Sequence, residues 1–221
     1  MQQTTFPIEA KKIAAYNHEE YIVSSSNNTS YNRIMNWPQN WGVKPYEKSL
    51  LLTGSKSSGK TYLATIWAKL AIAKFITKET ELTTATINNN QAFILEDIDK
   101  DIDEQQILHY FNILHENQKY LLITSCRNLQ IKLPDLSSRL NSINKLSINM
   151  PDDELVKMLI FKLFSNYSIV VSPEIINYLL MVIPREFDKI IEYIECINKY
   201  ALENKRKVTI PLVKEALSLL V

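Results

Sequence analysis

The sequence predicts an α/β fold, with a mostly parallel β-sheet in the first 150 residues and a smaller helical part after it. Short apolar runs alternate with helical stretches up to Met150-Pro151, and only helical patterns follow. The first apolar run leads into a loop that holds two of the chain's three glycines. Alternating strands and helices are typical of a parallel sheet that helices cover on both faces.

Each element of the first part follows from a local pattern. A loop rich in Ser and Asn, residues 24–30, precedes a short helix that Pro38 ends. A run without Gly or Pro predicts a helix from Thr61 to Ile76. Strands are expected at Ser49–Thr53, Thr84–Ile87, Ala92–Glu96, Tyr120–Thr124 and Lys145–Ile148, the second of them on a weak pattern.

The second part is expected to contain helices only. One helix covers Asp152–Ser165 and starts with acidic residues, which a helix N-terminus favours. Others begin at Ser172-Pro173, at Phe187 with a single apolar stripe, and at Thr209. We therefore expect three parts: an arm of residues 1–12, an α/β core of residues 13–149 and a helical domain of residues 150–221.

Composition excludes several classes of function. The 221 residues are 46% hydrophobic and 22% charged, with a formal net charge of +1, so no overall field attracts DNA. No apolar run is long enough to span a membrane, and the polar N-terminus is not a secretory signal. Two cysteines, Cys126 and Cys196, and three histidines argue against a zinc site and fit the reducing cytoplasm.

The loop after the first strand has the form G-x-x-x-x-G-K-T, which is the phosphate-binding P-loop. Its glycines let backbone N–H groups point inward at phosphate, Lys60 adds a positive charge, and the Thr61 hydroxyl is placed for Mg²⁺. We expect ADP or ATP to bind here with Mg²⁺. The expected contact residues are Gly54, Ser55, Lys56, Ser57, Ser58, Gly59, Lys60, Thr61 and Tyr62.

An apolar strand ending in carboxylates, Phe93–Asp99, follows the P-loop and has the pattern of a Walker B element. Glu96 is expected to hold Mg²⁺ together with Thr61, and Asp97 to orient an attacking water. The next strand ends in Ser125-Cys126-Arg127, a polar tip where a γ-phosphate or water can be sensed.

Two arginines have competing interpretations. Arg139 is either a structural partner of Asp135 or an arginine finger offered to a neighbour's nucleotide. Arg185, at a helix start, either lies on a solvated face or closes over the phosphates of the chain's own nucleotide.

These motifs together resemble the DnaA/Hda family of AAA+ proteins over nearly the whole chain. Pro134–Leu140 is similar to the family's P-D-L-x-S-R-L box, and Arg206–Glu215 to its R-K-L-T-I-P-x-V-K-E segment. Tyr21–Asn28 resembles the segment that flanks adenine. The resemblance implies an AAA+ core with a helical lid, and a cytoplasmic regulator of replication initiation. It also implies that Arg139 acts in trans on ATP bound to DnaA.

The same resemblance predicts a function for the N-terminal segment. Gln3, Phe6, Pro7 and Ile8 are similar to the family's Q-x-x-L-P-L motif, which implies docking on the DNA polymerase III sliding clamp (β). Taken alone, this segment is more typical of a disordered or loosely packed terminus, because short peptide motifs are unspecific. A homo-oligomer is left open, and no strong direct binding to DNA is expected.

Departures from the family pattern keep rival functions open. The chain ends in the lid, the segment between the second expected strand and Walker B is short, and Glu96 and Cys126 replace residues usual at those places. The short segment puts single-strand and origin-remodelling functions in doubt. The alternatives are a self-sufficient DnaA-like ATPase acting on nucleic acid, and a structural adaptor in which nucleotide only stabilises the fold.

Overall fold

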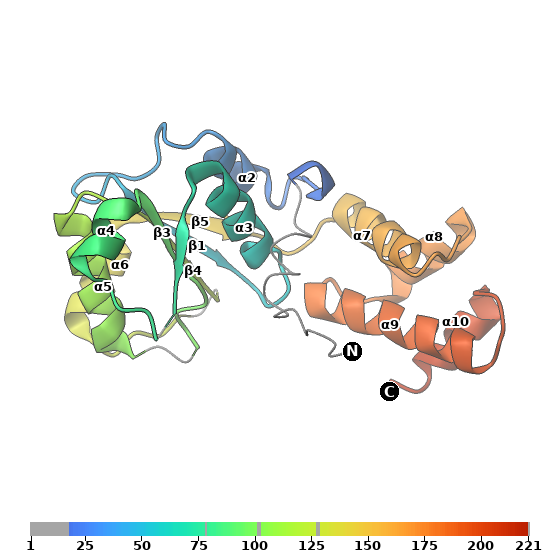
Figure 1. Ribbon diagram of the computed structural model, residues 1–221. Helices are drawn as coiled ribbons and strands as arrows, with labels where there is room; N and C mark the ends of the chain where they lie inside the picture. Colours follow the sequence, from blue (N-terminus) through green and yellow to red (C-terminus); the bar gives the residue numbers. More distant parts are fainter. Residues whose placement is uncertain (1–17, 78, 101–102, 127–128, 221) are drawn as a thin grey trace, which may run out of the picture. The chain divides into compact units, whose positions relative to one another are not determined.

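The computed structural model describes residues 18–77, 79–100, 103–126 and 129–220 (Figure 1). The chain divides into two units. The first contains residues 18–21, Asn27–Gly54 and Gly59–Ile148, and the second contains Ile22–Ser26, Ser55–Ser58 and the chain from Asn149 onward. Among the described residues, no helix combines the length and apolar character that crossing a membrane requires.

The first unit is built on a five-stranded sheet with the order β2-β3-β4-β1-β5, in which all pairs are parallel. This confirms the predicted fold class. The strands are β1 (Ser49–Gly54), β2 (Lys74–Ile76), β3 (Ala92–Leu95), β4 (Tyr120–Ser125) and β5 (Asn144–Ile148). β1 lies between β4 and β5, and parallel sheets bind ligands at the carboxyl ends of such strands.

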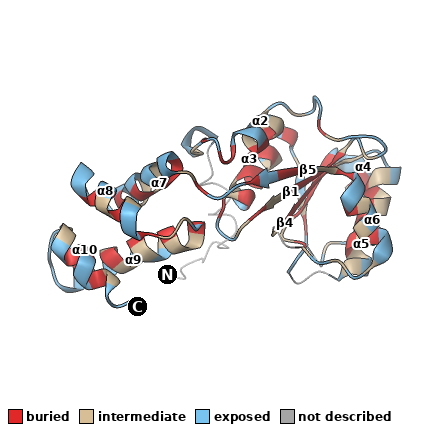
Figure 2. Cartoon of the chain, turned by 180° about the vertical axis from the view of Figure 1, so that it is seen from behind, coloured by how far each residue is buried: buried red, intermediate tan, exposed pale blue. Residues whose placement is uncertain are grey.

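Helices cover both faces of this sheet, which explains why its central strands are buried along nearly their whole length (Figure 2). The helices of the first unit are η1 (His18–Glu20), α2 (Asn28–Met35), α3 (Lys60–Ala71), α4 (Thr84–Asn89), α5 (Glu104–Glu116) and α6 (Pro134–Ser142). α5 and α6 pack on one face through a core that includes Phe111, Leu136 and Leu140. α3 packs against β1, β3 and β4, and α2 against α3.

Two predicted elements were wrong. Thr84–Ile87 is not a strand but the start of α4, because the Thr83 hydroxyl caps a helix by accepting from the N–H of Thr86 at 3.1 Å. The helix after the P-loop ends at Ala71 instead of Ile76, because Ile72 adopts a left-handed conformation with φ of 50°. The second strand is therefore β2, and residues 77–91, with α4, separate it from β3. The doubt about single-strand functions, which rested on a short segment there, loses its basis.

The second unit is helical after residue 150, as predicted. Its helices are α7 (Asp153–Asn166), α8 (Pro173–Val182), α9 (Phe187–Glu203) and α10 (Ile210–Leu217). The apolar stripe of α9 lies in the core of this unit, where Ile190, Ile194 and Ile197 are fully buried. Asp152 caps α7 by accepting from the N–H of Leu155 at 2.8 Å.

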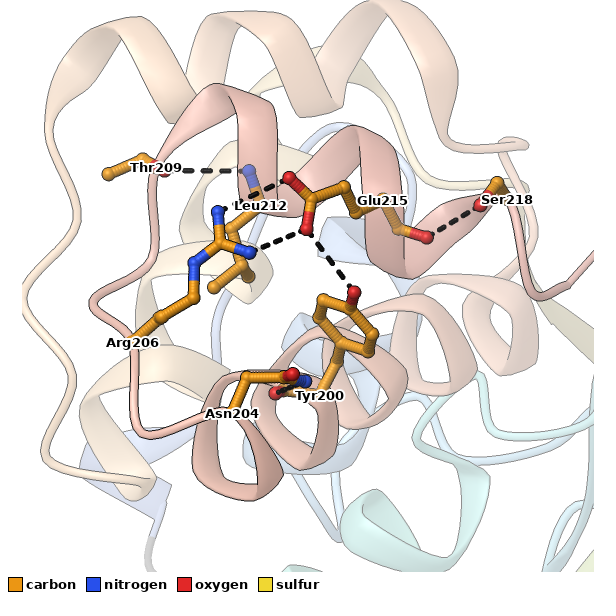
Figure 3. A network of polar contacts seen from close by, with 7 residues as sticks. All are labelled: Tyr200, Asn204, Arg206, Thr209, Leu212, Glu215 and Ser218. Carbon is orange, nitrogen blue, oxygen red and sulfur yellow. Dashed lines mark hydrogen bonds and ion pairs between the residues drawn. The ribbon is translucent and has the colours of Figure 1, made fainter.

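The connection between α9 and α10 is held by a polar network, drawn in Figure 3. Arg206 makes two bonds to the carboxylate of Glu215, at 2.6 and 3.2 Å. The hydroxyl of Tyr200 donates to the same carboxylate at 3.2 Å, and Thr209 caps α10 at the N–H of Leu212 at 3.4 Å. The Arg206–Glu215 motif of the sequence therefore has a structural role, because it fixes the turn between two helices.

Candidate functional site

The P-loop connects the buried end of β1 to the first turn of α3, as its motif predicts. Gly59 has a φ of 93°, which side chains of L-residues rarely adopt. A Cβ placed on it would also lie 3.3 Å from the ring of Tyr21. Glycine is therefore required at this position for two independent reasons, one in the backbone and one in packing.

Lys60 is folded back over the loop. Its side chain is buried, and its Nζ donates to the carbonyl oxygen of Gly54 at 3.0 Å. The side chain therefore connects the last part of the loop with its first residue. Lys56, Ser57 and Thr61 are exposed, whereas Ser58 is buried. Among the described residues the Ser58 hydroxyl has no hydrogen-bond partner. A buried cation and an unsatisfied donor in one loop fit an anion such as phosphate.

Glu96 directly follows β3 and is half-buried. Burial raises the pKa of its carboxyl, while a hydrogen bond from the Thr61 hydroxyl opposes this rise. The structure thus brings together the two residues predicted for Mg²⁺. Glu96 Oε1 is buried and has no partner in the described chain. A hydroxyl and an unsatisfied carboxylate oxygen are the donor types that Mg²⁺ takes, so these residues fit the ion.

No group of three or more His, Cys, Asp or Glu side chains able to hold a metal occurs in the described ranges. A magnesium ion at Thr61 and Glu96 would therefore take its other ligands from phosphate and water, which is usual for Mg²⁺ in nucleotide sites.

Asp97 is the next residue after Glu96, but its side-chain ion pair and the hydrogen bond of its N–H are with Lys100 and Thr124 and not with Thr61 or Glu96. Its φ is 48°, and its N–H donates to the Thr124 hydroxyl at 2.8 Å. Its carboxylate forms an ion pair with Lys100 at 2.6 Å. The role expected for Asp97 in orienting water stays a prediction.

Sequence reasoning assigned no role to Asp99, which ties the ends of β3 and β4 together. Its Oδ1 accepts from the hydroxyl of Ser125 at 3.1 Å and from the N–H of Cys126 at 2.9 Å. Burial raises the pKa of Asp99, but these hydrogen bonds outweigh it and leave the pKa below its usual value. Asp99 therefore fixes the polar tip of β4, which the sequence had marked as a sensing position. Only the D-I-D spacing at the strand end could have pointed to it.

An aromatic group lies beside Gly59. Tyr21 stacks on Tyr31 with ring centroids 5.6 Å apart, and meets Tyr62 edge to face at 5.3 Å. Burial raises the pKa of the Tyr21 hydroxyl, so it stays protonated at any physiological pH. Tyr62 was expected near the nucleotide from its position in the motif, whereas Tyr31 was not.

Both candidate arginines have partners within their own unit. Arg139 donates to the Tyr46 hydroxyl at 3.3 Å and to Asp135 at 3.5 Å. Arg185 pairs with Asp153 at 2.8 Å, while its Nη1 is buried without a partner in the described chain. The structural pair anticipated for Arg139 exists, and the catalytic alternatives for both residues stay predictions.

The candidate clamp motif, Gln3, Phe6, Pro7 and Ile8, lies outside the described residues. Its docking function likewise stays a prediction.

Comparisons with known proteins agree with the fold. Domain III of the replication initiation protein DnaA from Thermotoga maritima has a TM-score of 0.72 at 18% identity, covering 92% of this chain and 95% of that one. AMPPCP-bound DnaA from Aquifex aeolicus has a TM-score of 0.59 at 19% identity, covering 91% of this chain and 79% of that one. An uncharacterised protein of Haemophilus influenzae is 28% identical over 185 residues, 75% of this chain and 80% of that protein.

The parallel sheet, the P-loop after β1 and the helical unit that follows the sheet make up the AAA+ fold. Residues 152–217 match the family model described as the lid domain of Hda. The chain therefore combines a segment similar to the Hda lid domain with the fold of DnaA. Both findings agree with the family resemblance that the sequence motifs indicate.

Proposed function

We propose that the protein is a nucleotide-binding regulator of chromosome replication initiation, which docks on the sliding clamp and promotes hydrolysis of ATP bound to DnaA. The match of residues 152–217 to the Hda lid domain carries this proposal, because it separates Hda-like members from other proteins with the same fold. Such a protein would act in the cytoplasm, where the replication machinery lies.

The proposed nucleotide, ADP or ATP, is supported by the geometry of the P-loop and by relatives of the same fold. DnaA of Aquifex aeolicus has been solved with AMPPCP. In this chain, Lys60 and the inward-facing loop would hold the phosphates, and Thr61 and Glu96 would hold Mg²⁺. The ion supplies charge neutralisation for the phosphates when bound.

The proposed regulation relies on Arg139. A guanidinium offered across an interface stabilises the charge that develops on the transferred phosphoryl group, and such fingers increase rates by about 10³–10⁵. In the nucleotide-binding unit, Arg139 is a quarter exposed and makes long, weak bonds to its neighbours, so a partner's phosphate can compete for it.

The test is the rate at which DnaA-bound ATP is hydrolysed in a mixture of DnaA, DNA-loaded clamp and this protein. Substituting Arg139→Ala is expected to lower the stimulated rate by a factor of about 10³. Asp135→Asn is the matched control, because it removes the charge of the exposed partner of Arg139 but keeps the guanidinium. Equal stimulation by Arg139→Ala and the unaltered protein would contradict the proposal, provided that circular dichroism shows both folded.

The rival function is a self-sufficient ATPase that acts on nucleic acid. The preserved pairing of Thr61 with Glu96 keeps this alternative in view. Turnover of ATP by the protein alone distinguishes the two: the rival function requires fast hydrolysis that DNA increases, and the proposed regulator requires neither.

A further inference from the structure

Arg139 lies on a small group of rings that the proposed function does not explain. Tyr46 meets Phe111 edge to face at 5.0 Å and His115 at 4.9 Å. The guanidinium carbon of Arg139 is 6.0 Å from the centroid of the Phe111 ring, within the range of a cation–π interaction. Phe111 and His115 belong to α5 and Arg139 to α6, two helices that pack side by side (Figure 1).

The loop that carries Tyr46 is held firmly in place before β1. Val43 and Tyr46 form an isolated antiparallel bridge, and the N–H of Ser49 donates to the Tyr46 carbonyl at 3.0 Å. Gly42 makes this close turn possible, because a Cβ there would lie 2.4 Å from the Tyr46 carbonyl oxygen. The Tyr46 ring therefore has a fixed base from which its hydroxyl reaches Arg139.

The guanidinium of Arg139 is oriented from two sides. Its Nη1 donates to the Tyr46 hydroxyl at 3.3 Å and its Nη2 to Asp135 at 3.5 Å. Its Nε is buried and has no partner in the described chain. A guanidinium held over a ring face and by two weak acceptors leaves the side chain few rotamers, yet does not lock it.

We propose that Tyr46 is a positioning residue for Arg139. Its hydroxyl aims the guanidinium so that less side-chain entropy is lost when Arg139 engages a phosphate across an interface. The inference rests on the proposed function, because it assigns a role toward the nucleotide of a partner.

The test compares Tyr46→Phe with Tyr200→Phe in the assay of DnaA-bound ATP hydrolysis. Each substitution removes one tyrosine hydroxyl with one side-chain partner, but Tyr200 bonds to Glu215 in the helical unit. Tyr46→Phe is expected to lower the maximal stimulated rate about three- to tenfold, the effect of one long and therefore weak hydrogen bond. The protein concentration for half-maximal stimulation should not change, and Tyr200→Phe should leave both quantities unchanged.

A second measurement reads the contact without any partner. The side-chain Nε–H signal of Arg139 in the NMR spectrum of the full chain, identified by its absence in Arg139→Lys, is expected to show greater mobility in Tyr46→Phe. A purely structural role for Tyr46 would change stability without a separate change in maximal rate. Asp135→Asn removes the charge of the second acceptor of Arg139. It should lower the maximal stimulated rate by less than Tyr46→Phe does.

The outcomes separate the two proposals. Normal stimulation by the unaltered protein with an unchanged or increased rate for Tyr46→Phe would overturn the positioning role alone. An unaltered protein that fails to stimulate DnaA would overturn the proposed function, and the positioning role with it. Unchanged mobility of the Arg139 signal in Tyr46→Phe would overturn the positioning role whatever the rates show.

Discussion

Gly59 shows how much a single residue of the P-loop determines. The sequence motif predicted a glycine for the turn, and its φ of 93° agrees with that reason. The second reason, its approach to the Tyr21 ring, follows from no local pattern, and only the family resemblance placed the segment of Tyr21 near the nucleotide. Contacts between residues far apart in sequence, such as Asp99 with Cys126 or Tyr46 with Arg139, share this limit.

Replacing Gly59 with Ala tests both constraints together. We expect Gly59→Ala to lower the free energy of unfolding by about 1–2 kcal/mol, the cost of a left-handed conformation for an L-residue. Ser57→Ala is the control, because it adds alanine to the same loop at an exposed position without changing the backbone requirement. Urea unfolding of the nucleotide-free protein measures both, and a Gly59→Ala variant as stable as the unaltered chain would refute the argument.

At the scale of elements, the ends of helices and strands were the weakest part of the sequence-based prediction. The helix start at Asp152 and the strand starts at Ser49 and Ala92 agree with their local signals. The end of α3 did not, because Ile72 occupies a C-cap position where glycine is usual. No local pattern predicts a left-handed conformation for isoleucine. The predicted helix therefore continued to Ile76 and included the residues that form β2.

Replacing Ile72 with glycine is expected to stabilise the protein, which is unusual for the removal of a large apolar side chain. It is 84% exposed and left-handed, so its side chain loses little packing on removal while its backbone conformation is costly. Ile72→Gly should therefore raise the free energy of unfolding by about 1 kcal/mol. Leu70→Gly, two residues earlier within the helix, should lower it by about the same amount. A destabilising effect of Ile72→Gly in thermal unfolding would show that the conformation is not strained.

Asp152 at the start of α7 makes stability depend on pH. A hydrogen bond from the Ser25 hydroxyl and another from the Leu155 N–H lower the pKa of Asp152 below its ordinary value of 3.8. Since the folded state favours the ionised form, this contribution is fully present above the unfolded pKa and is lost as pH falls through the folded pKa.

Asp152→Ala should accordingly lower the free energy of unfolding by about 1 kcal/mol at pH 7, the usual value of an N-cap. The difference from the unaltered protein should shrink as pH falls below 3.8. Glu154→Ala, an exposed carboxylate in the same turn, serves as the control. A difference that stays constant from pH 7 to pH 3 would rule out the ionised cap.

At the scale of the whole molecule, the sequence supported the architecture better than the function. The P-loop, the Walker B strand and the change of pattern near residue 150 predicted the order of the chain's parts, because strand–helix alternation and helical periodicity are local properties. The action on another protein's nucleotide depends instead on Arg139, whose contacts in the structure are all with its own chain. Neither a pattern nor a single chain contains the partner that would complete such a site.

The most direct test of the proposed regulator is the clamp dependence of its effect on DnaA. Hydrolysis of DnaA-bound ATP is measured in single turnover with the unaltered protein, a Gln3→Ala, Phe6→Ala variant, and a Thr4→Ala, Thr5→Ala control from the same segment. We expect fast hydrolysis only when DNA-loaded clamp is present, loss of this stimulation in the first variant, and full stimulation in the control. Equal rates with and without clamp, or no stimulation by the unaltered protein, would contradict the proposed function.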